Sequence, residues 1–92
     1  MPVRPRRFWL RTRPEFIRVY GRLELTLQEE VRERVFEFRE RVNHGRLKVH
    51  KLHGRMEGRL SFSVNYKYRI VFKYIDKNTA EFLTIGDHDI YK

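Results

Sequence analysis

The sequence contains no cysteine and no long hydrophobic run. The absence of cysteine excludes disulfide bonds, a thiolate nucleophile and a zinc–thiolate site. No apolar stretch approaches the roughly 20 residues that a membrane-spanning helix needs, and residues 1–7 lack the apolar core of a signal peptide. We therefore expect a cytoplasmic protein with no contact to a membrane.

Acidic residues are scarce relative to basic ones. Among 92 residues there are 21 Lys and Arg but only 12 Asp and Glu, which gives a formal net charge of +9. The range from His44 to Lys73 contains eight Lys and Arg residues but a single acidic residue, Glu57. Such a balance favours a polyanionic partner, which is either nucleic acid or an acidic protein.

The apolar content is enough for one small core. With 40% hydrophobic and 14% aromatic residues, residues 1–92 are expected to form a single domain without help from a cofactor. His50 and His53 have no third ligand at a suitable spacing, so we expect no metal site.

The first half of the chain predicts a strand followed by two helices. Phe8 and Leu10 alternate with Arg7, Trp9 and Arg11, which favours a short strand. Thr12 with Glu15, and Thr26 with Glu29, have capping-box spacing at the start of each helix. The apolar positions are Phe16, Val19, Tyr20 and Leu23 in the first helix, and Leu27, Val31, Val35, Phe38 and Val42 in the second. Because the linker is short, we expect an antiparallel helical hairpin that ends at Asn43-His44-Gly45.

The second half predicts three strands. Leu60, Phe62 and Val64 alternate with polar residues, so one face of this strand should pack on the helices. The ranges 68–75 and 79–85 predict two more strands joined by a turn, and residues 46–58 read as a basic loop. The expected fold is α+β, of order β-α-α-β-β-β, with an antiparallel four-stranded sheet covered on one face by the helical hairpin.

Residues that can handle a phosphodiester gather in the last third of the chain. Arg69 could bind a phosphate through its fork of donors, and His88 titrates near neutral pH as an acid or a base. Tyr91 could supply a proton or stack on a base, and His50 could approach from the basic loop. The cations expected to bind RNA around these four residues are Lys48, Lys51, Arg55, Arg59, Lys67 and Lys73.

The order of these elements and motifs resembles the RelE/ParE superfamily of toxin–antitoxin toxins. The resemblance covers nearly the whole chain. It rests on His50-Lys51-Leu52-His53-Gly54, Tyr68-Arg69-Ile70-Val71-Phe72 and Ile85-Gly86-Asp87-His88 followed by Tyr91. RelE-like members of the family cut mRNA in the ribosomal A site, whereas ParE-like members inhibit DNA gyrase.

The resemblance implies a type II toxin that cleaves mRNA on the ribosome without a metal ion. It places Arg69, His88 and Tyr91 in catalytic positions, and His50 resembles a loop histidine of another nuclease branch. It also implies a cognate acidic antitoxin as partner, beside the ribosome and mRNA. The antitoxin would cover a basic concave sheet surface or displace the C-terminal residues.

The assignment of acid and base stays open at this point. If His88 is the acid, His50 or Lys51 must act as the base. If His88 is the base, Tyr91 or an arginine must assist the leaving group.

Other functions compete with the nuclease. RelE-like sequences have lysines roughly where this chain has Leu60 and Phe62, so a catalytically weakened member is one alternative. A gyrase inhibitor without catalysis and a non-catalytic RNA- or ribosome-binding module are two others. Structural roles compete as well, because Arg69 could pair with Glu81 across the sheet and His44 could serve the end of a helix.

Overall fold

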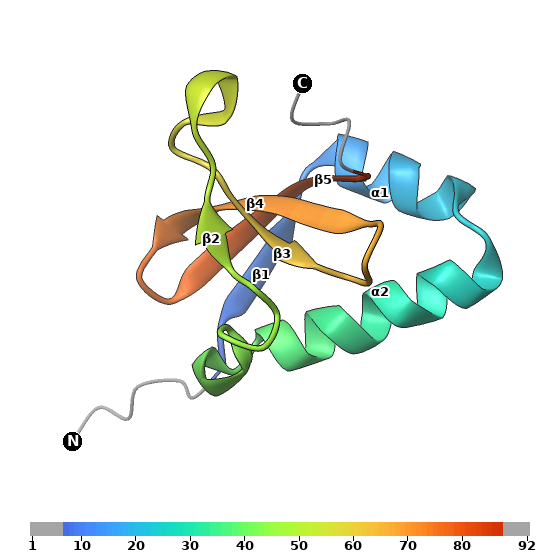
Figure 1. Ribbon diagram of the computed structural model, residues 1–92, viewed down its shortest axis with the longest axis horizontal. Helices are drawn as coiled ribbons and strands as arrows, with labels where there is room; N and C mark the ends of the chain where they lie inside the picture. Colours follow the sequence, from blue (N-terminus) through green and yellow to red (C-terminus); the bar gives the residue numbers. More distant parts are fainter. Residues whose placement is uncertain (1–6, 88–92) are drawn as a thin grey trace.

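The computed structural model describes residues 7–87, which form two helices against one curved sheet (Figure 1). The elements are β1 (Trp9–Thr12), α1 (Pro14–Arg22), α2 (Leu25–Phe38), β2 (His50–Lys51), β3 (Leu60–Ser63), β4 (Arg69–Asp76) and β5 (Thr79–Gly86), with short 3-10 helices at Arg41–Asn43 and Gly54–Met56. Within the described residues, neither helix is long and apolar enough to span a membrane.

The expected α+β architecture is confirmed, and the sheet has one more strand than expected. Its order is β1-β5-β4-β3-β2. The antiparallel β3-β4-β5 meander lies where the alternation placed it. β1 adds to the free edge of β5 in parallel orientation, so the sheet is mixed rather than antiparallel. The fifth strand, β2, comes from the range expected to be a loop, because a two-residue strand is too short to show periodicity.

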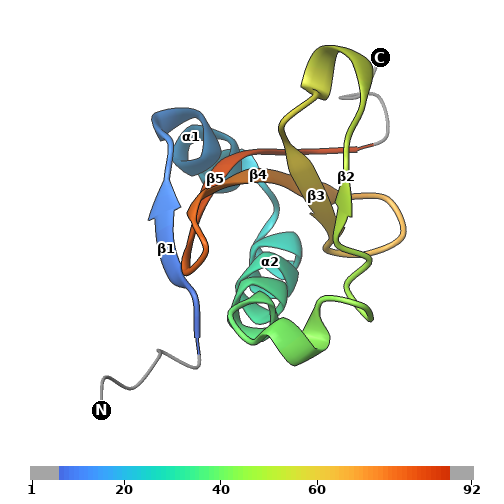
Figure 2. The ribbon, with the colours of Figure 1, turned by 90° about the vertical axis from the view of Figure 1, so that its left-hand side faces the viewer.

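The core lies between the sheet and α2 and is largely aromatic. The Phe38 ring of α2 stacks on Phe62 of β3 at 4.5 Å and meets Phe72 of β4 edge-on at 4.9 Å. Phe82 of β5 packs against Phe38 at 5.5 Å and against Phe16 of α1 at 5.4 Å. Figure 2 shows the sheet arching over α2, with α1 beside β5. Each buried ring contributes roughly 1.5–3 kcal/mol by leaving water.

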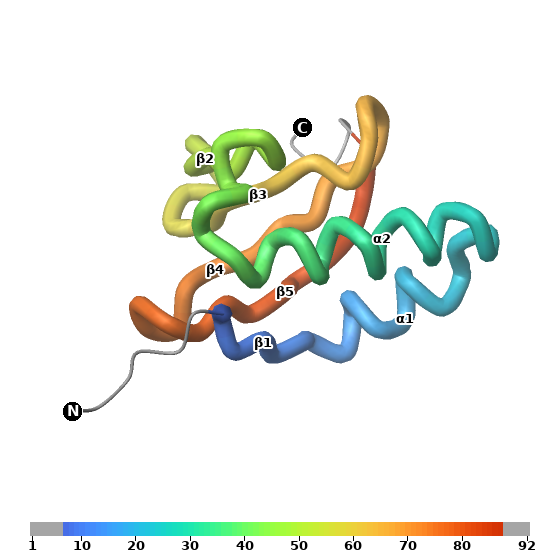
Figure 3. Tube along the Cα trace, turned by 90° about the horizontal axis from the view of Figure 1, so that it is seen from below, coloured from blue at the N-terminus to red at the C-terminus, as the bar shows by residue number. Residues whose placement is uncertain are grey.

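The helices run antiparallel, as expected, with the chain passing out along α1 and back along α2 (Figure 3). The capping box predicted for α1 is wrong. Thr12 still belongs to β1, and the Arg13 N–H donates to the Phe82 carbonyl at 2.9 Å, so strand pairing extends to the residue before the helix. Arg13 is therefore the N-cap and makes no side-chain cap, while Pro14 takes the first helical position.

The second predicted capping box is also wrong. α2 begins at Leu25 with Glu24 as an N-cap that makes no side-chain hydrogen bond. The Gln28 N–H already donates to the Glu24 carbonyl at 2.9 Å, which places Thr26 inside the first turn and out of capping position.

α2 ends at Phe38, about one turn before the predicted stop. Val42, expected on the apolar stripe, is 84% exposed. The Asn43 side-chain amide donates to the Glu37 carbonyl at 2.8 Å, and Nε2 of His44 lies 2.7 Å from the Phe38 carbonyl oxygen. Because these side chains bond to the last carbonyl groups of the helix, they end it several residues before their own positions in the sequence.

Candidate functional site

The sheet face opposite the core carries three of the candidate residues, namely His50, Arg69 and Lys73. Directly paired residues of an antiparallel sheet project to the same side. The register pairs Ser63 with Arg69, and Lys73 with Glu81. Their alternate neighbours on these strands, such as Phe62 and Phe72, belong to the core. The strands thus place a guanidinium and an ammonium group opposite the aromatic core.

Arg69 lies at the end of this face where β5 finishes. Its guanidinium donates to Oγ of Ser63 at 3.0 Å, and its register partner on β5 is Gly86. The alternative pairing with Glu81 is not formed, because Glu81 faces Lys73 instead. His88 and Tyr91 follow Gly86 in the chain and lie outside the described residues, so their positions relative to Arg69 stay a prediction.

His50 lies on the same face, on the edge strand β2. It pairs with Ser61, one pleat away from Ser63 and its partner Arg69. Nδ1 of His50 lies 2.8 Å from the Lys48 carbonyl oxygen. A carbonyl can only accept, so Nδ1 carries the hydrogen and Nε2 of the neutral ring keeps its lone pair. That tautomer is the one a general base at Nε2 requires.

The Lys48 carbonyl owes its position to an unusual backbone conformation. Lys48 has φ 59°, in the left-handed region that non-glycine residues adopt infrequently. This turn brings the chain from Leu47, which is buried, into β2. In this conformation the Lys48 carbonyl oxygen points at the imidazole of His50.

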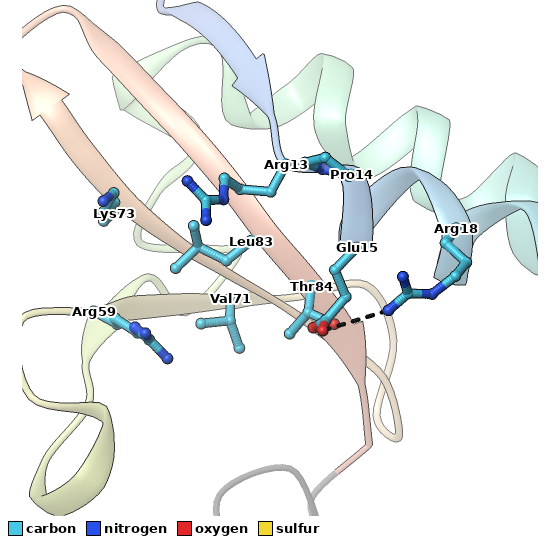
Figure 4. Close-up of a pocket in the computed structure, with 9 residues that line it drawn as sticks. All are labelled: Arg13, Pro14, Glu15, Arg18, Arg59, Val71, Lys73, Leu83 and Thr84. Atoms are coloured by element: carbon cyan, nitrogen blue, oxygen red, sulfur yellow. Dashed lines mark ion pairs between the residues drawn. The ribbon is translucent and has the colours of Figure 1, made fainter.

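A cavity of about 490 Å³ opens on this face where α1 begins (Figure 4). Four cations and one acid surround an otherwise small or apolar lining. The lining residues are Arg13, Pro14, Glu15, Arg18, Arg59, Val71, Lys73, Leu83 and Thr84. In Figure 4 the Arg13 side chain extends over Leu83 toward Lys73, while Arg59 approaches from the opposite side. The cavity is therefore positively charged and has an apolar floor.

Two of the cavity cations are partly neutralised by carboxylates. Nζ of Lys73 lies 3.7 Å from Glu81, whose carboxylate is also 4.0 Å from Arg11. The Glu81 side chain is only 8% exposed. Arg18 pairs with Glu15 at 3.7 Å on the cavity rim. The sequence suggested Glu81 as a partner of Arg69 on this face, but it did not indicate that Glu81 pairs with Lys73 and Arg11 instead, or that Arg13 lines the cavity.

The predicted RNA-binding cations do not form one cluster. Arg59 and Lys73 meet at the large cavity, whereas Lys51 and Arg59 line a second cavity of about 260 Å³. Lys67 lies in the turn before β4, with Nζ 5.5 Å from the centre of the Tyr68 ring. Lys48 lies before β2 and Arg55 in a 3-10 helix, and both are exposed. These cations are therefore distributed over several surface segments of the described residues.

An apolar groove of about 380 Å³ separates the helices on the other side of the molecule. Phe16, Tyr20 and Val35 line it, and Ile17 and Phe36 at its edge are 55% and 62% exposed. An exposed apolar surface of this kind is typical of a protein–protein contact.

Taken together, these observations define an α+β domain with an aromatic core under a mixed sheet and a basic opposite face. No protein-family model matches the chain, and no curated protein matches it significantly. Solved structures do resemble it. The RelBE2 toxin–antitoxin complex of Mycobacterium tuberculosis superimposes with a TM-score of 0.73 at 19% identity, covering 89% of this chain and 99% of that one.

Two further structures agree. The YoeB–YefM complex of Staphylococcus aureus matches with a TM-score of 0.67 at 20% identity over 89% of this chain and 98% of the other. The archaeal RelE–RelB complex of Pyrococcus horikoshii matches with a TM-score of 0.65 at 15% identity over 87% and 93%. The fold of this chain is the RelE/ParE toxin fold, as its motifs predicted.

Proposed function

We propose that this protein is the toxin of a type II toxin–antitoxin system and cleaves mRNA on the ribosome by metal-independent acid–base chemistry. The observation that supports it most is the geometry of the open sheet face. On a RelE/ParE fold, His50 of β2 offers a lone pair at Nε2, and Arg69 offers a guanidinium on the same face, two strands across the sheet on β4.

The proposed reaction is attack of a ribose 2′-hydroxyl on the adjacent phosphorus. Nε2 of His50 takes the 2′-hydroxyl proton while the new bond from 2′-oxygen to phosphorus forms. Arg69 compensates the charge that develops on the phosphoryl oxygens. The bond from phosphorus to the 5′-oxygen breaks, and His88 gives that oxygen a proton. Tyr91 stacks on a neighbouring base or assists the proton transfer.

The proposed protein partner is a cognate acidic antitoxin. Toxin–antitoxin complexes are among the structures that share this fold. The excess of cations, with a formal net charge of +9, provides an electrostatic attraction that such a partner can use. Affinity for the antitoxin and for RNA should therefore fall as ionic strength rises. A salt-independent affinity would contradict this part of the proposal.

Cell-free translation of a defined mRNA tests the nuclease directly. New 5′ ends are mapped by primer extension with and without ribosomes, for the wild type, His88→Ala and Arg69→Gln. We expect cuts that require ribosomes and that disappear with either substitution. Arg22→Gln is the control, because it removes one exposed charge from the last turn of α1, outside the candidate residues, and should preserve the cuts.

Uncleaved mRNA at stoichiometric wild-type protein would contradict the nuclease. A supercoiling assay would then ask whether the protein inhibits gyrase instead. Loss of folding in His88→Ala, seen as a changed circular dichroism spectrum, would favour a structural role for that residue.

A further inference from the structure

We propose that the cavity at the start of α1 is a subsite for one nucleotide of single-stranded RNA, with the phosphate bound between Arg13 and Arg59. The identity of the polymer rests on the proposed function, while the anion-binding character of the cavity rests on its own lining.

The size and lining of the cavity suit one nucleotide. Its volume of about 490 Å³ is in the range of small-molecule sites. Val71, Leu83 and Pro14 provide apolar surface for a base or ribose, and the cations lie around them. A lining that combines an apolar floor with a charged rim matches the two chemical parts of a nucleotide.

Arg13 and Arg59 carry the charge that is available to a phosphate. Among residues 7–87, the ion pairs of the cavity link Lys73 to Glu81 and Arg18 to Glu15, each at 3.7 Å. Neither Arg13 nor Arg59 forms an ion pair within that part of the chain. Within residues 7–87, the Arg59 guanidinium donates a hydrogen bond to the Met56 sulfur at 3.5 Å. Two guanidinium groups therefore lie beside the cavity without a carboxylate partner, and guanidinium groups bind phosphate through paired donors.

The first turn of α1 adds a second source of positive potential. The helix spans nine residues, and no side chain caps its N-terminus. Pro14 has no N–H, so Glu15 and Phe16 carry the first N–H groups of the helix, and these have no carbonyl partner within it. Such groups, together with the helix dipole, favour an anion at this end. The Glu15 carboxylate opposes that attraction, which makes its removal informative.

The register connects this cavity to the proposed cleavage site. Val71 and Thr84 line the cavity and are paired with each other, and Val71 is also paired with Ser61, the partner of His50. Arg69 and Gly86 lie one pleat further along the same strands. An RNA strand whose phosphate binds Arg69 would thus reach the cavity with a neighbouring nucleotide.

Binding of a 2′-O-methylated RNA tetranucleotide tests the subsite without cleavage, because the attacking hydroxyl is blocked. Fluorescence anisotropy would compare the wild type with Arg13→Gln, Glu15→Gln and Arg22→Gln. Arg22 is the matched control, since it lies at the other end of α1 and outside the cavity lining. We expect Arg13→Gln to weaken binding about tenfold, in line with the loss of a charge-assisted hydrogen bond, and Arg22→Gln about twofold or less.

Glu15→Gln should instead tighten binding, because it removes the negative charge at the rim. The salt dependence should lose roughly 0.7 of a unit in slope for Arg13→Gln, the value for one phosphate contact on a single strand. In the wild type, the backbone amide resonances of Glu15 and Phe16 should shift on titration. Equal effects of Arg13→Gln and Arg22→Gln, or unshifted amides at Glu15 and Phe16, would overturn the subsite.

These outcomes separate the subsite from the proposed function. If the wild type does not cut mRNA but Arg13→Gln still weakens oligonucleotide binding selectively, the subsite stands and the nuclease fails. If mRNA is cut but the two arginine variants bind alike, the nuclease stands and the subsite fails.

Discussion

The two faces of the β3–β4–β5 meander are built from the same strands but should respond differently to substitution. On one face Phe62, Phe72 and Phe82 pack around Phe38 and exclude water. On the other, Lys73 lines an open cavity and pairs with Glu81. We therefore expect the stability of the fold to depend mainly on the first face, and the proposed binding to depend on the charges of the second. Substitutions on the first face should therefore change stability, and substitutions on the second should change function.

The largest effect should come from the core face. Phe38→Ala removes a fully buried ring that contacts aromatic residues of three strands. We expect it to lower the free energy of unfolding by about 3–5 kcal/mol. Phe36→Ala is the control on the same helix, because that ring is 62% exposed, and it should cost about 1 kcal/mol or less. Urea denaturation measures both, and equal losses would contradict the location of the core.

On the opposite face, His50→Gln should affect catalysis far more than stability. It removes the proposed base at Nε2, while the exposed position tolerates the new side chain. We expect cleavage of ribosome-bound mRNA to slow by about 100-fold, the lower end of what a general base contributes. His53→Gln is the matched control, an exposed histidine beyond β2. A similar slowing in both variants would show that His50 has no special role.

A smaller change in the free energy of unfolding is expected at Ser61, where the hydroxyl of the polar face is buried. Its side chain is fully buried, and Oγ has no hydrogen-bond partner among the described residues. Ser61→Ala should therefore raise the free energy of unfolding by about 1 kcal/mol. Ser63→Ala, one pleat away, removes the acceptor of Arg69 and should lower it by about 0.5–1 kcal/mol. Destabilisation by Ser61→Ala would indicate that its hydroxyl is paired in solution.

The smallest expected effect is a pH dependence on the core side. Burial lowers the pKa of His44, the hydrogen bond to the Phe38 carbonyl partly offsets this, and the Arg41 charge lowers it further. The unfolded chain thus binds the proton at a higher pH than the folded one. His44 should contribute fully above its unfolded pKa of about 6.5, and this contribution should be lost as the pH falls below that value.

The corresponding measurement compares urea midpoints of the wild type and His44→Gln at pH 7.5 and at pH 5. The wild type should lose more stability between the two pH values than the variant does. An identical loss would mean that the charge state of His44 is not linked to folding.

Local patterns predicted the elements well where a single physical cause decides them. The alternation around Phe62 and Phe72 located the meander because side chains of a strand alternate between faces. The proline at position 14 marked the start of α1 because its ring fits the first helical turn. The capping boxes failed because β1 extends to Thr12 and α2 starts before Thr26. The first of these outcomes depends on pairing with β5, which is distant in sequence.

The candidate site also has features that the sequence predicted and features that it did not. Arg69 and His50 were identified from residue type and motif, and the structure places both on one sheet face. The tautomer of His50 was not predictable, since it follows from the left-handed turn at Lys48. The position of Arg13 was not predictable either, because nothing in its neighbours indicates that it borders a cavity with Arg59.

The sequence by itself determined the α+β class, the strand alternation, the helical hairpin and the basic character of the protein, because these depend on residue type and short spacing. The tertiary structure alone decided the parallel pairing of β1 with β5, the addition of β2 and the enclosure of Glu81 by Arg11 and Lys73. The cavity at α1 belongs to the second group. Its walls come from segments far apart in the chain, and only packing of the hydrophobic core brings them together.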